Sequence, residues 1–169
     1  NNTYVDYQTI LKDKDILSMK AYEQGRDFIE EESSLDIIYE DDLLCVVNKP
    51  SNLIIHPDDK SKKNTLCNYV SYYYQQSYQD LPIRYLHRLD RDTTGLVMFC
   101  KCALLQPYFD YMIASKKIKK TYLAIIQGHL PKREITIDLP IGQDRHSKNK
   151  MCISKTGKDA LTHFKEIKT

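Results

Sequence analysis

The feature that most constrains the fold of this 169-residue chain is a series of short apolar runs, each bounded by turn-forming or charged residues. Short runs with such boundaries are typical of β-strands, because a helix needs a longer periodic stretch. The runs are Ile37–Tyr39, Leu43–Val47, Leu96–Cys100, Tyr122–Ile126, Ile135–Leu139 and Ala160–Ile167. Many strands with few helices and short turns predict an α+β fold with a mixed, mainly antiparallel β-sheet and flanking helices.

Two segments have the spacing of amphipathic helices. Thr65 is a good N-cap, and it precedes four residues on one helix face, namely Leu66, Tyr69, Val70 and Tyr73. A second helix is indicated by Phe109, Met112 and Ile113, with Pro107 allowed in its first turn. We expect the aromatic residues of the first helix to belong to the core rather than to a cofactor site.

The first 34 residues differ from the rest, because their scattered apolar positions end in the acidic run Glu30–Ser34. We interpret residues 1–34 as an N-terminal extension that combines the end of a preceding small domain with a linker. Residues 35–169 then form the main domain, without an internal repeat. The sequence starts at Asn1 and stops just after a strand-like stretch, so we expect it to be part of a longer polypeptide, incomplete at the C-terminus of this domain.

The charges are divided unevenly along the chain. Residues 1–80 carry 8 Lys and Arg against 15 Asp and Glu, whereas residues 81–169 carry 17 against 8, so the halves differ as −7 and +9 although the net charge is only +2. A basic half favours a polyanionic partner, because clustered cations neutralise phosphates and release counterions. A merely solvated lysine-rich surface explains the charge equally well.

The five cysteines contain no Cys-x-x-Cys pair and no even set for disulfides, and most have apolar neighbours. Buried free thiols in a reducing compartment are the simplest interpretation. No apolar run approaches the roughly 20 residues of a membrane span, and the polar start is unlike a signal peptide. We therefore expect a cytoplasmic protein with no membrane partner.

The densest polar segment, Tyr85–Gly95, lies between apolar runs. In it, Asp90 stands between Arg88 and Arg91, which would keep the carboxylate ionised and available as a nucleophile or base. Thr93, Thr94 and Gly95 follow as a turn whose hydroxyl and amide groups can support this loop. The alternative is a surface turn with local salt bridges, and composition does not decide between the two.

Three ordered motifs resemble a known family. His87–Leu96 is similar to the pattern His-Arg-Leu-Asp-x-x-Thr-Ser-Gly-Leu of RluA-type RNA pseudouridine synthases, with Thr94 in place of the serine. The stretch from Tyr39 to Pro57 resembles the first motif of that family, and Lys120–Ala124 with Gly128 resembles its tyrosine motif. The first motif departs at Ser51-Asn52, where the family has a small residue and glycine, so the turn after Pro50 is expected to differ in shape.

The resemblance implies isomerisation of uridine in ribosomal or transfer RNA, without cofactor or metal. It implies that Asp90 is the catalytic carboxylate, acting either as a nucleophile on a ribose carbon or as a base on a ribose proton. Tyr122 matches the active-site tyrosine, which packs on the target base and moves the proton of the ring carbon. Without the family match, Tyr122 would be taken for a core residue of a strand.

Further residues are implied to bind the RNA. Arg88 matches the residue that enters the base stack when the uridine flips out, and His87 is grouped with it, although we expect a scaffold role for this histidine. Lys119, Lys120 and Arg145 are candidate phosphate contacts, and residues 1–34 would be the remnant of a preceding RNA-binding domain. The expected enzyme is a monomer.

One family motif is absent. Beyond a strand that matches Ala160–Phe164, the family has a Gly-Arg-Thr-His-Gln-like motif whose basic residue pairs with the catalytic aspartate, and the sequence stops before it. We therefore expect this chain alone to be inactive or weak.

Two other functions compete with this one. His87, Asp90 and Asp92 have the ligand types of a metal-dependent phosphoesterase, although neighbouring arginines would repel the cation. The basic half alone would suffice for a non-catalytic RNA-binding module in which Asp90 has no role.

Overall fold

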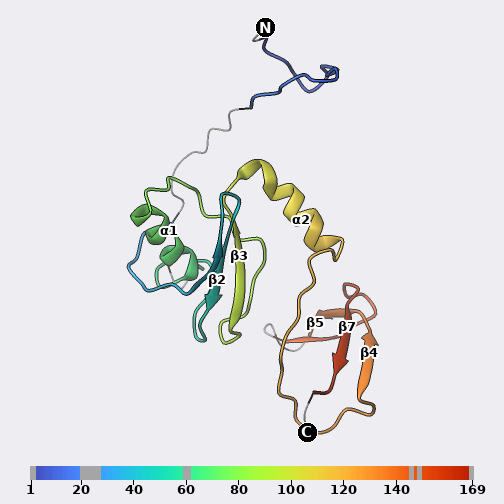
Figure 1. Ribbon diagram of the computed structural model, residues 1–169. Helices are drawn as coiled ribbons and strands as arrows, with labels where there is room; N and C mark the ends of the chain where they lie inside the picture. The colour runs from blue at the N-terminus through green and yellow to red at the C-terminus, as the bar shows by residue number, and fades with distance from the viewer. Residues whose placement is uncertain (1–2, 20–27, 59–61, 145–146, 148–149, 168–169) are drawn as a thin grey trace. The chain divides into compact units, whose positions relative to one another are not determined.

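The computed structural model describes residues 3–19, 28–58, 62–144, 147 and 150–167. The chain divides into two compact units, Asn1–Lys119 and Lys120–Thr169, which we describe separately. Figure 1 gives the element labels. The described helices and strands, with antiparallel strand ladders, confirm the predicted α+β class.

The first unit is built on a three-stranded antiparallel sheet in the order β1-β2-β3 (Figure 1). The strands are β1 (Ile37–Glu40), β2 (Leu44–Lys49) and β3 (Gly95–Cys100), so the first three predicted strands are confirmed. Their buried face shows the period of two that a half-buried strand requires, because Cys45, Val47, Val97 and Phe99 are all fully buried.

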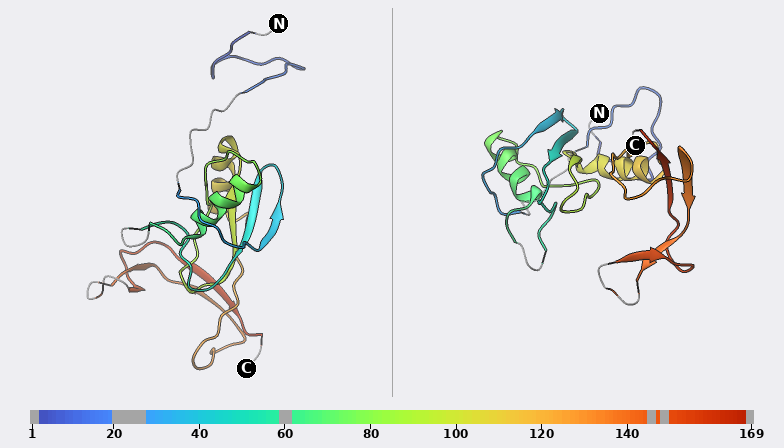
Figure 2. Two further views of the ribbon diagram at one scale, coloured as in Figure 1. Left: turned by 90° about the vertical axis from the view of Figure 1, so that its left-hand side faces the viewer. Right: turned by 90° about the horizontal axis from the view of Figure 1, so that it is seen from below.

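Helix α1 (Leu66–Gln76) packs on this buried face of the sheet (Figures 1 and 2). Thr65 is its N-cap, as predicted, and forms a capping box with Asn68. The buried positions are Leu66, Cys67, Val70 and Tyr74. The buried face of α1 is therefore rotated relative to the predicted one. Tyr69 and Tyr73 are only half-buried and keep their hydroxyl groups near polar partners.

Residues 28–36, which include the expected linker, contact α1 and β2. The side chains of Asn68 and Ser71 donate hydrogen bonds to the carbonyl groups of Ile29 (2.7 Å) and Phe28 (3.3 Å). Asn48 donates from its backbone amide to Asp36 (2.9 Å). The acidic segment that we expected to be a linker is therefore bordered by residues that are hydrogen-bonded to α1 and β2. The domain boundary at residue 35 stays a prediction.

After β3 the chain forms a 3-10 helix, η1 (Ala103–Leu105), and then α2 (Gln106–Ala114), with Pro107 in the first turn as predicted. None of the α2 residues is buried, and the expected inward residues Phe109, Met112 and Ile113 are only half-buried. Among the described residues, no helix combines the length and the hydrophobicity that crossing a membrane requires.

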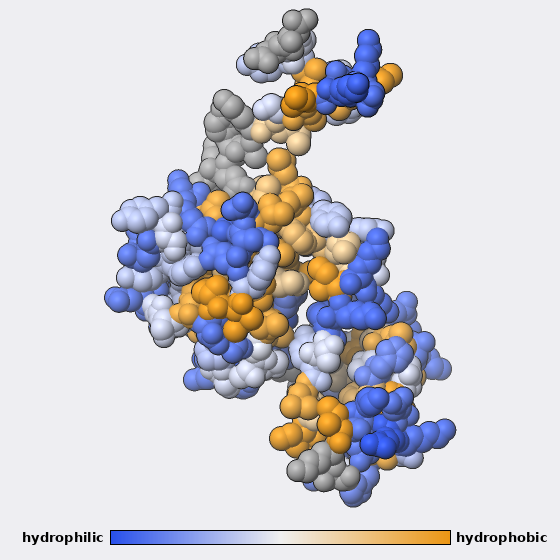
Figure 3. Space-filling model, in the orientation of Figure 1, coloured by the Kyte–Doolittle hydropathy of each residue, from blue (hydrophilic) through white to orange (hydrophobic). Residues whose placement is uncertain are grey.

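The described residues of the second unit form two antiparallel strand pairs. β4 (Glu134–Asp138) pairs with β7 (Leu161–Lys165), as the last two predicted strands require, and β5 (Ile141–Gln143) pairs with β6 (Met151–Ile153), a hairpin that we did not predict. Figure 3 shows hydrophobic residues on the surface of this unit beside hydrophilic ones.

The predicted strand Tyr122–Ile126 is wrong for this structure. The segment has no regular secondary structure, and Leu123 and Ile125 are 86% and 103% exposed. A strand needs a neighbouring strand to satisfy its backbone groups, and within the described residues this segment pairs with none. Apolar composition alone therefore overestimated its tendency to form a ladder.

The five cysteines are all free. Cys45, Cys67 and Cys100 are buried as expected, whereas Cys102 is half-buried and Cys152 is exposed. Burial raises the pKa of the Cys45 thiol to about 11 and that of Cys67 to about 12.

Candidate active site

The segment that carries Asp90 is attached to the sheet at both ends. Before it, residues 84–86 run antiparallel to β3 on the edge opposite β2, where Leu86 donates from its amide to Met98 and Cys100 donates to Arg84 (2.9 and 2.8 Å). After it, the chain enters β3 directly at Gly95. Both ends of the loop of residues 87–94 are therefore attached to β3: the loop follows the segment that pairs with β3, and it continues into β3 itself.

The end of the loop has a defined backbone conformation. The amide of Thr93 donates a hydrogen bond to the carbonyl of Asp90 (3.2 Å), which closes the turn that follows the aspartate. Gly95 has a φ of +122°, a value that residues with a Cβ rarely adopt. Since a Cβ at this position would meet nothing within 4 Å, the backbone angle rather than crowding favours glycine here.

The charged side chains of the loop point into solvent. Asp90, Arg88, Arg91 and Asp92 are all exposed. Within the described residues, neither arginine forms a salt bridge with Asp90. The alternative of a surface turn held by local salt bridges is therefore not supported, and the Asp90 carboxylate remains accessible to a ligand.

The loop is instead attached to the turn that follows β2, through Lys49. Lys49 is completely buried, and its ammonium group donates to the carbonyl oxygens of Pro50, Leu53 and Arg91, each at 2.8 Å. Burial lowers the pKa of Lys49, while the nearby carboxylates Asp92 and Asp90 act in the opposite direction. Sequence analysis placed Lys49 in the first motif but gave it no role.

The turn after Pro50 contains the departure from the family pattern. Asn52 has a φ of +59°, in the left-handed region that glycine adopts most readily and that asparagine tolerates better than most residues. Asn52 thus adopts a conformation that glycine also favours, and the expected difference in the shape of the turn stays a prediction. The hydroxyl of Ser51 donates to the carbonyl of Asp92 (3.3 Å), a second link from this turn to the loop.

His87 lies half-buried at the start of the loop, and its Nε2 accepts a hydrogen bond from the backbone amide of Met98 (3.4 Å). The ring is therefore directed toward β3, which agrees with a scaffold role. The metal alternative lacks the geometry it needs, because the described residues, which include His87, Asp90 and Asp92, contain no group of three or more potential ligands.

A stacked pair of rings lies next to the loop. His56 and Tyr85 have ring centroids 5.5 Å apart and an interplanar angle of 17°. The His56 ring is fixed further by Nδ1, which donates to the carbonyl of Pro57 (2.8 Å). This pair connects the chain after β2 with the segment that leads into the loop, and sequence analysis missed it because stacking between residues 29 positions apart has no local signal.

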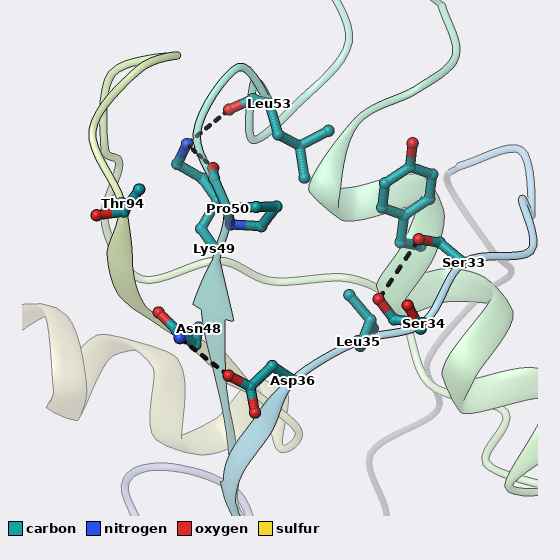
Figure 4. Close-up of a pocket in the computed structure, with 10 residues that line it drawn as sticks. Ser33, Ser34, Leu35, Asp36, Asn48, Lys49, Pro50, Leu53 and Thr94 are labelled. Atoms are coloured by element: carbon teal, nitrogen blue, oxygen red, sulfur yellow. Dashed lines mark hydrogen bonds between the residues drawn. The ribbon is translucent and has the colours of Figure 1, made fainter.

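A cavity of about 510 Å³ lies behind the end of the loop in the first unit. Figure 4 shows its walls: residues 33–36 on one side, the end of β2 with Lys49 and Pro50, and Thr94 from the loop. Asn48 donates from its side chain to the Asp36 carboxylate (2.9 Å) at one edge of this cavity. The cavity therefore lies between the N-terminal segment and the end of the loop.

The other expected site residues belong to a different part of the chain. Tyr122 and Lys120 are exposed in the second unit, Tyr122 at 57%, and Lys119 is exposed at the end of the first. Arg145 lies outside the described residues. Within the first unit, the structure brings together His87, Asp90, Thr93, Thr94 and Gly95 and adds Lys49 to them.

An α+β domain with an exposed carboxylate on a loop held by a sheet is a suitable scaffold for an enzyme. Residues 43–169 match the family model described as RNA pseudouridylate synthase. The chain belongs to this family, and the resemblance to its RluA group is confirmed by relatives in bacteria.

Two such relatives define the similarity. The chain is 38% identical over 137 residues to the uncharacterized RNA pseudouridine synthase YhcT of Bacillus subtilis, covering 81% of the chain and 45% of that protein. It is 33% identical over 152 residues to the ribosomal large subunit pseudouridine synthase D of Neisseria meningitidis, covering 89% of the chain and 40% of that protein. The chain thus spans less than half the length of these relatives.

Solved structures agree on the fold. Human RNA pseudouridylate synthase domain containing 1 superposes with a TM-score of 0.61 at 24% identity, covering 80% of this chain and 54% of the human one. Human RNA pseudouridylate synthase domain containing 4 superposes with a TM-score of 0.52 at 19% identity. These values support the predicted pseudouridine synthase fold.

Proposed function

We propose that the full-length protein isomerises specific uridines to pseudouridine in structured RNA, with Asp90 as the catalytic carboxylate. The observation that carries the proposal is Asp90 itself, an exposed carboxylate on a loop attached to the sheet at both ends, inside the residues matched by the family model. The relatives support ribosomal RNA as the first substrate to test, since several are named ribosomal large subunit pseudouridine synthases.

The chemistry is an isomerisation, so no atom or electron is gained or lost overall. The bond from the ribose to the ring nitrogen breaks, the uracil turns, and a ring carbon forms the new bond to the ribose. That ring carbon loses its proton, and the released ring nitrogen gains one. Asp90 acts on the ribose, either as a nucleophile toward its carbon or as a base toward its proton.

Water must be kept from the site while the uracil is detached. A glycosidase uses a second carboxylate to activate water, whereas here the free base has to be recaptured. One carboxylate on the loop is sufficient for this purpose. Tyr122 is proposed to pack on the uracil and to move the proton from the ring carbon.

The RNA has to present an unstacked uridine. Extracting a base from a helix costs a few kcal/mol, which an inserted planar cation partly offsets. Exposed Arg88, two residues before Asp90, is proposed for this role, and Lys119, Lys120 and Arg145 for contacts to phosphates. Thr93, Thr94 and Gly95 support the loop, and we propose a monomer that acts in the cytoplasm.

The test is tritium release from a transcript of large-subunit ribosomal RNA whose uracils carry tritium on the ring carbon that forms the new bond. In the full-length protein, Asp90→Asn is expected to lower the rate by about 10²–10⁴-fold, the range for loss of a positioned catalytic acid or base. Asp110→Asn is the matched control, since it removes an exposed carboxylate from α2. It should leave the rate unchanged.

Each alternative has its own outcome in this assay. Unchanged release by Asp90→Asn would reject the catalytic role of Asp90, whereas binding of the transcript by the unsubstituted protein without any release would favour the RNA-binding module. Cleavage of the transcript that EDTA abolishes would instead revive the metal-dependent phosphoesterase.

A further inference from the structure

Helix α2 carries two aromatic rings on its exposed side. Its half-buried face consists of Phe109, Met112 and Ile113, whereas Tyr108 and Tyr111 are 54% and 57% exposed. Residues three apart are neighbours on a helix surface, so the two phenol rings lie one turn apart on the same side. Unlike α1, which packs on the sheet, α2 extends away from it (Figures 1 and 2). Exposed aromatic rings that gather on one surface commonly mark a binding site.

Both rings are held by a neighbouring side chain. The rings of Tyr108 and Phe109 have centroids 5.7 Å apart and an interplanar angle of 66°, an edge-to-face contact. The ammonium group of Lys117 lies 5.2 Å from the centroid of the Tyr111 ring, a cation–π contact. Side chains that are already oriented lose less conformational freedom when a ligand binds. The two rings are therefore prepared to receive flat groups.

The C-terminus of α2 places two lysines beside these rings. The amide of Lys116 donates to the carbonyl of Ile113 (3.1 Å) and that of Lys117 to Met112 (2.9 Å), the two bonds of a Schellman motif. Lys116 has a φ of +58° at the position where such motifs usually have glycine. Glycine would adopt this conformation with less strain, so the turn itself does not explain a lysine here.

The charge around the rings is positive. Lys116, Lys117 and Lys119 are exposed, and among the described residues none of them forms a salt bridge. The acidic residue of α2, Asp110, lies about 100° or more around the helix axis from either ring. Aromatic rings next to uncompensated cations are the combination that binds single-stranded nucleic acid, because bases stack on the rings while the cations neutralise phosphates.

We infer that the α2 surface, defined as Tyr108, Tyr111, Lys116 and Lys117, binds an unpaired stretch of the substrate RNA, with bases stacked on the tyrosines and phosphates near the lysines. This inference rests on the proposed function, because it takes RNA as the substrate. The surface is separate from the catalytic loop, since α2 follows the opposite end of β3. Its loss should therefore weaken binding while the chemical step stays intact.

The experiment measures the Kd of the full-length protein for a fluorescein-labelled oligocytidylate by fluorescence anisotropy. This probe is single-stranded and contains no uridine, so its binding does not depend on turnover. Tyr111→Ala is expected to raise the Kd by about 10-fold, the scale of one lost base stack. Alanine is a good helix former, so α2 should remain folded. Tyr111→Phe keeps the ring and should stay within about twofold of the parent.

Tyr78→Ala is the matched control. Its side chain is fully exposed in the same unit, after α1 and away from any lysine cluster in the sequence, so the Kd should not change. Lys116→Gln and Lys117→Gln should each reduce the slope of log Kd against log salt concentration by about 0.7, the value for one phosphate contact on a single strand. Tyr111→Ala should leave that slope unchanged.

Several results would overturn the inference. One is a parent protein that does not bind the probe, and another is an unchanged Kd for Tyr111→Ala. Equal weakening by Tyr111→Ala and Tyr111→Phe would also overturn it, because the contact would then depend on the hydroxyl group and not on stacking. If the surface instead binds a second copy of the chain, Tyr111→Ala should alter sedimentation without RNA and leave the Kd as it was.

The tritium assay separates this inference from the proposed function. With the ribosomal transcript, Tyr111→Ala should raise KM by about 10-fold and keep kcat within about twofold. A protein that binds oligocytidylate through Tyr111 but releases no tritium would support the α2 surface and reject the proposed isomerisation. A protein that releases tritium with a KM indifferent to Tyr111→Ala would do the reverse.

Discussion

Glu40 and Lys101 form a salt bridge with 2.8 Å between Oε1 and Nζ, which joins the end of β1 to the residue after β3. Tyr73 and Gln79 also donate to the Glu40 carboxylate (2.5 and 3.0 Å), so α1 and the chain after it are held to the same point. This network lies at the opposite end of the β2–β3 ladder from Lys49. It affects the stability of the first unit rather than the candidate active site.

The Glu40 network predicts a pH-dependent stability. Burial alone would raise the pKa of Glu40, but the hydrogen bonds from Lys101, Tyr73 and Gln79 outweigh it and hold the pKa below the ordinary value of 4.5. A carboxyl with a depressed folded-state pKa stabilises fully above its unfolded value, and the contribution is lost as the pH falls through the folded value. Glu40→Gln should therefore lower the free energy of unfolding by roughly 1–3 kcal/mol at pH 7 and by less below pH 4.5.

Urea unfolding at several pH values measures this difference. Glu134→Gln is the control, because Glu134 pairs with Lys165 at 3.0 Å but both side chains are largely exposed, at 67% and 73%. It should change stability by under about 1 kcal/mol. Equal effects of the two substitutions would contradict the role given to burial.

Asn52 predicts a backbone effect without a change of contacts. Because its φ is +59°, Asn52→Ala should destabilise the protein by about 1–2 kcal/mol, the cost of placing a residue with a Cβ in the left-handed region. Asn52→Gly should be close to neutral or slightly stabilising, since glycine adopts this region freely. Urea denaturation of the three proteins decides, and an alanine variant as stable as the parent would show that the turn can adopt another conformation.

Arg88 predicts a dependence on RNA structure. If its guanidinium enters the base stack, Arg88→Ala should lower tritium release from the folded ribosomal transcript by about 10-fold or more, corresponding to part of the cost of flipping. Release from a short unstructured RNA with the same uridine should change much less. Arg88→Lys keeps the charge but not the plane, so full rescue by lysine would indicate a phosphate contact instead.

The cysteines predict a graded reactivity. Cys152 is exposed and should react fast with a thiol reagent such as iodoacetamide, followed by the half-buried Cys102. Cys45 and Cys67 should stay unmodified in the folded protein, because burial denies access and raises the pKa values of their thiols to about 11 and 12. Mass spectrometry after timed labelling counts the modified sites, and early labelling of Cys67 would mean that α1 opens.

Sequence patterns predicted the elements that depend on local order. β1, β2, β3 and the N-cap of α1 followed from runs of apolar residues, turn residues and capping preference. The strand expected at residues 122–126 failed because a ladder depends on a partner that the run itself does not reveal. The face of α1 was rotated because tyrosine can be half-buried at a position where periodicity alone suggests the core.

In the candidate site, too, local features were predictable from the sequence and contacts between distant segments were not. The pattern around Asp90 identified the loop, but the way in which the loop is held depends on contacts between distant segments. One signal for Lys49 was present, since it continues the inward alternation of Cys45 and Val47. Its three acceptors could not be predicted, because they are backbone carbonyl groups, which every residue has.

The register of β2 against β3 also affects how the enzyme would fail. Because alternate residues of a strand point to opposite faces, a slip of one residue in this ladder would turn Lys49 out of the core and separate it from Arg91. Closing the sheet in its native register and assembling the loop around Asp90 are thus a single event. A population of misfolded molecules should consequently lower the number of active enzymes without producing molecules of intermediate activity.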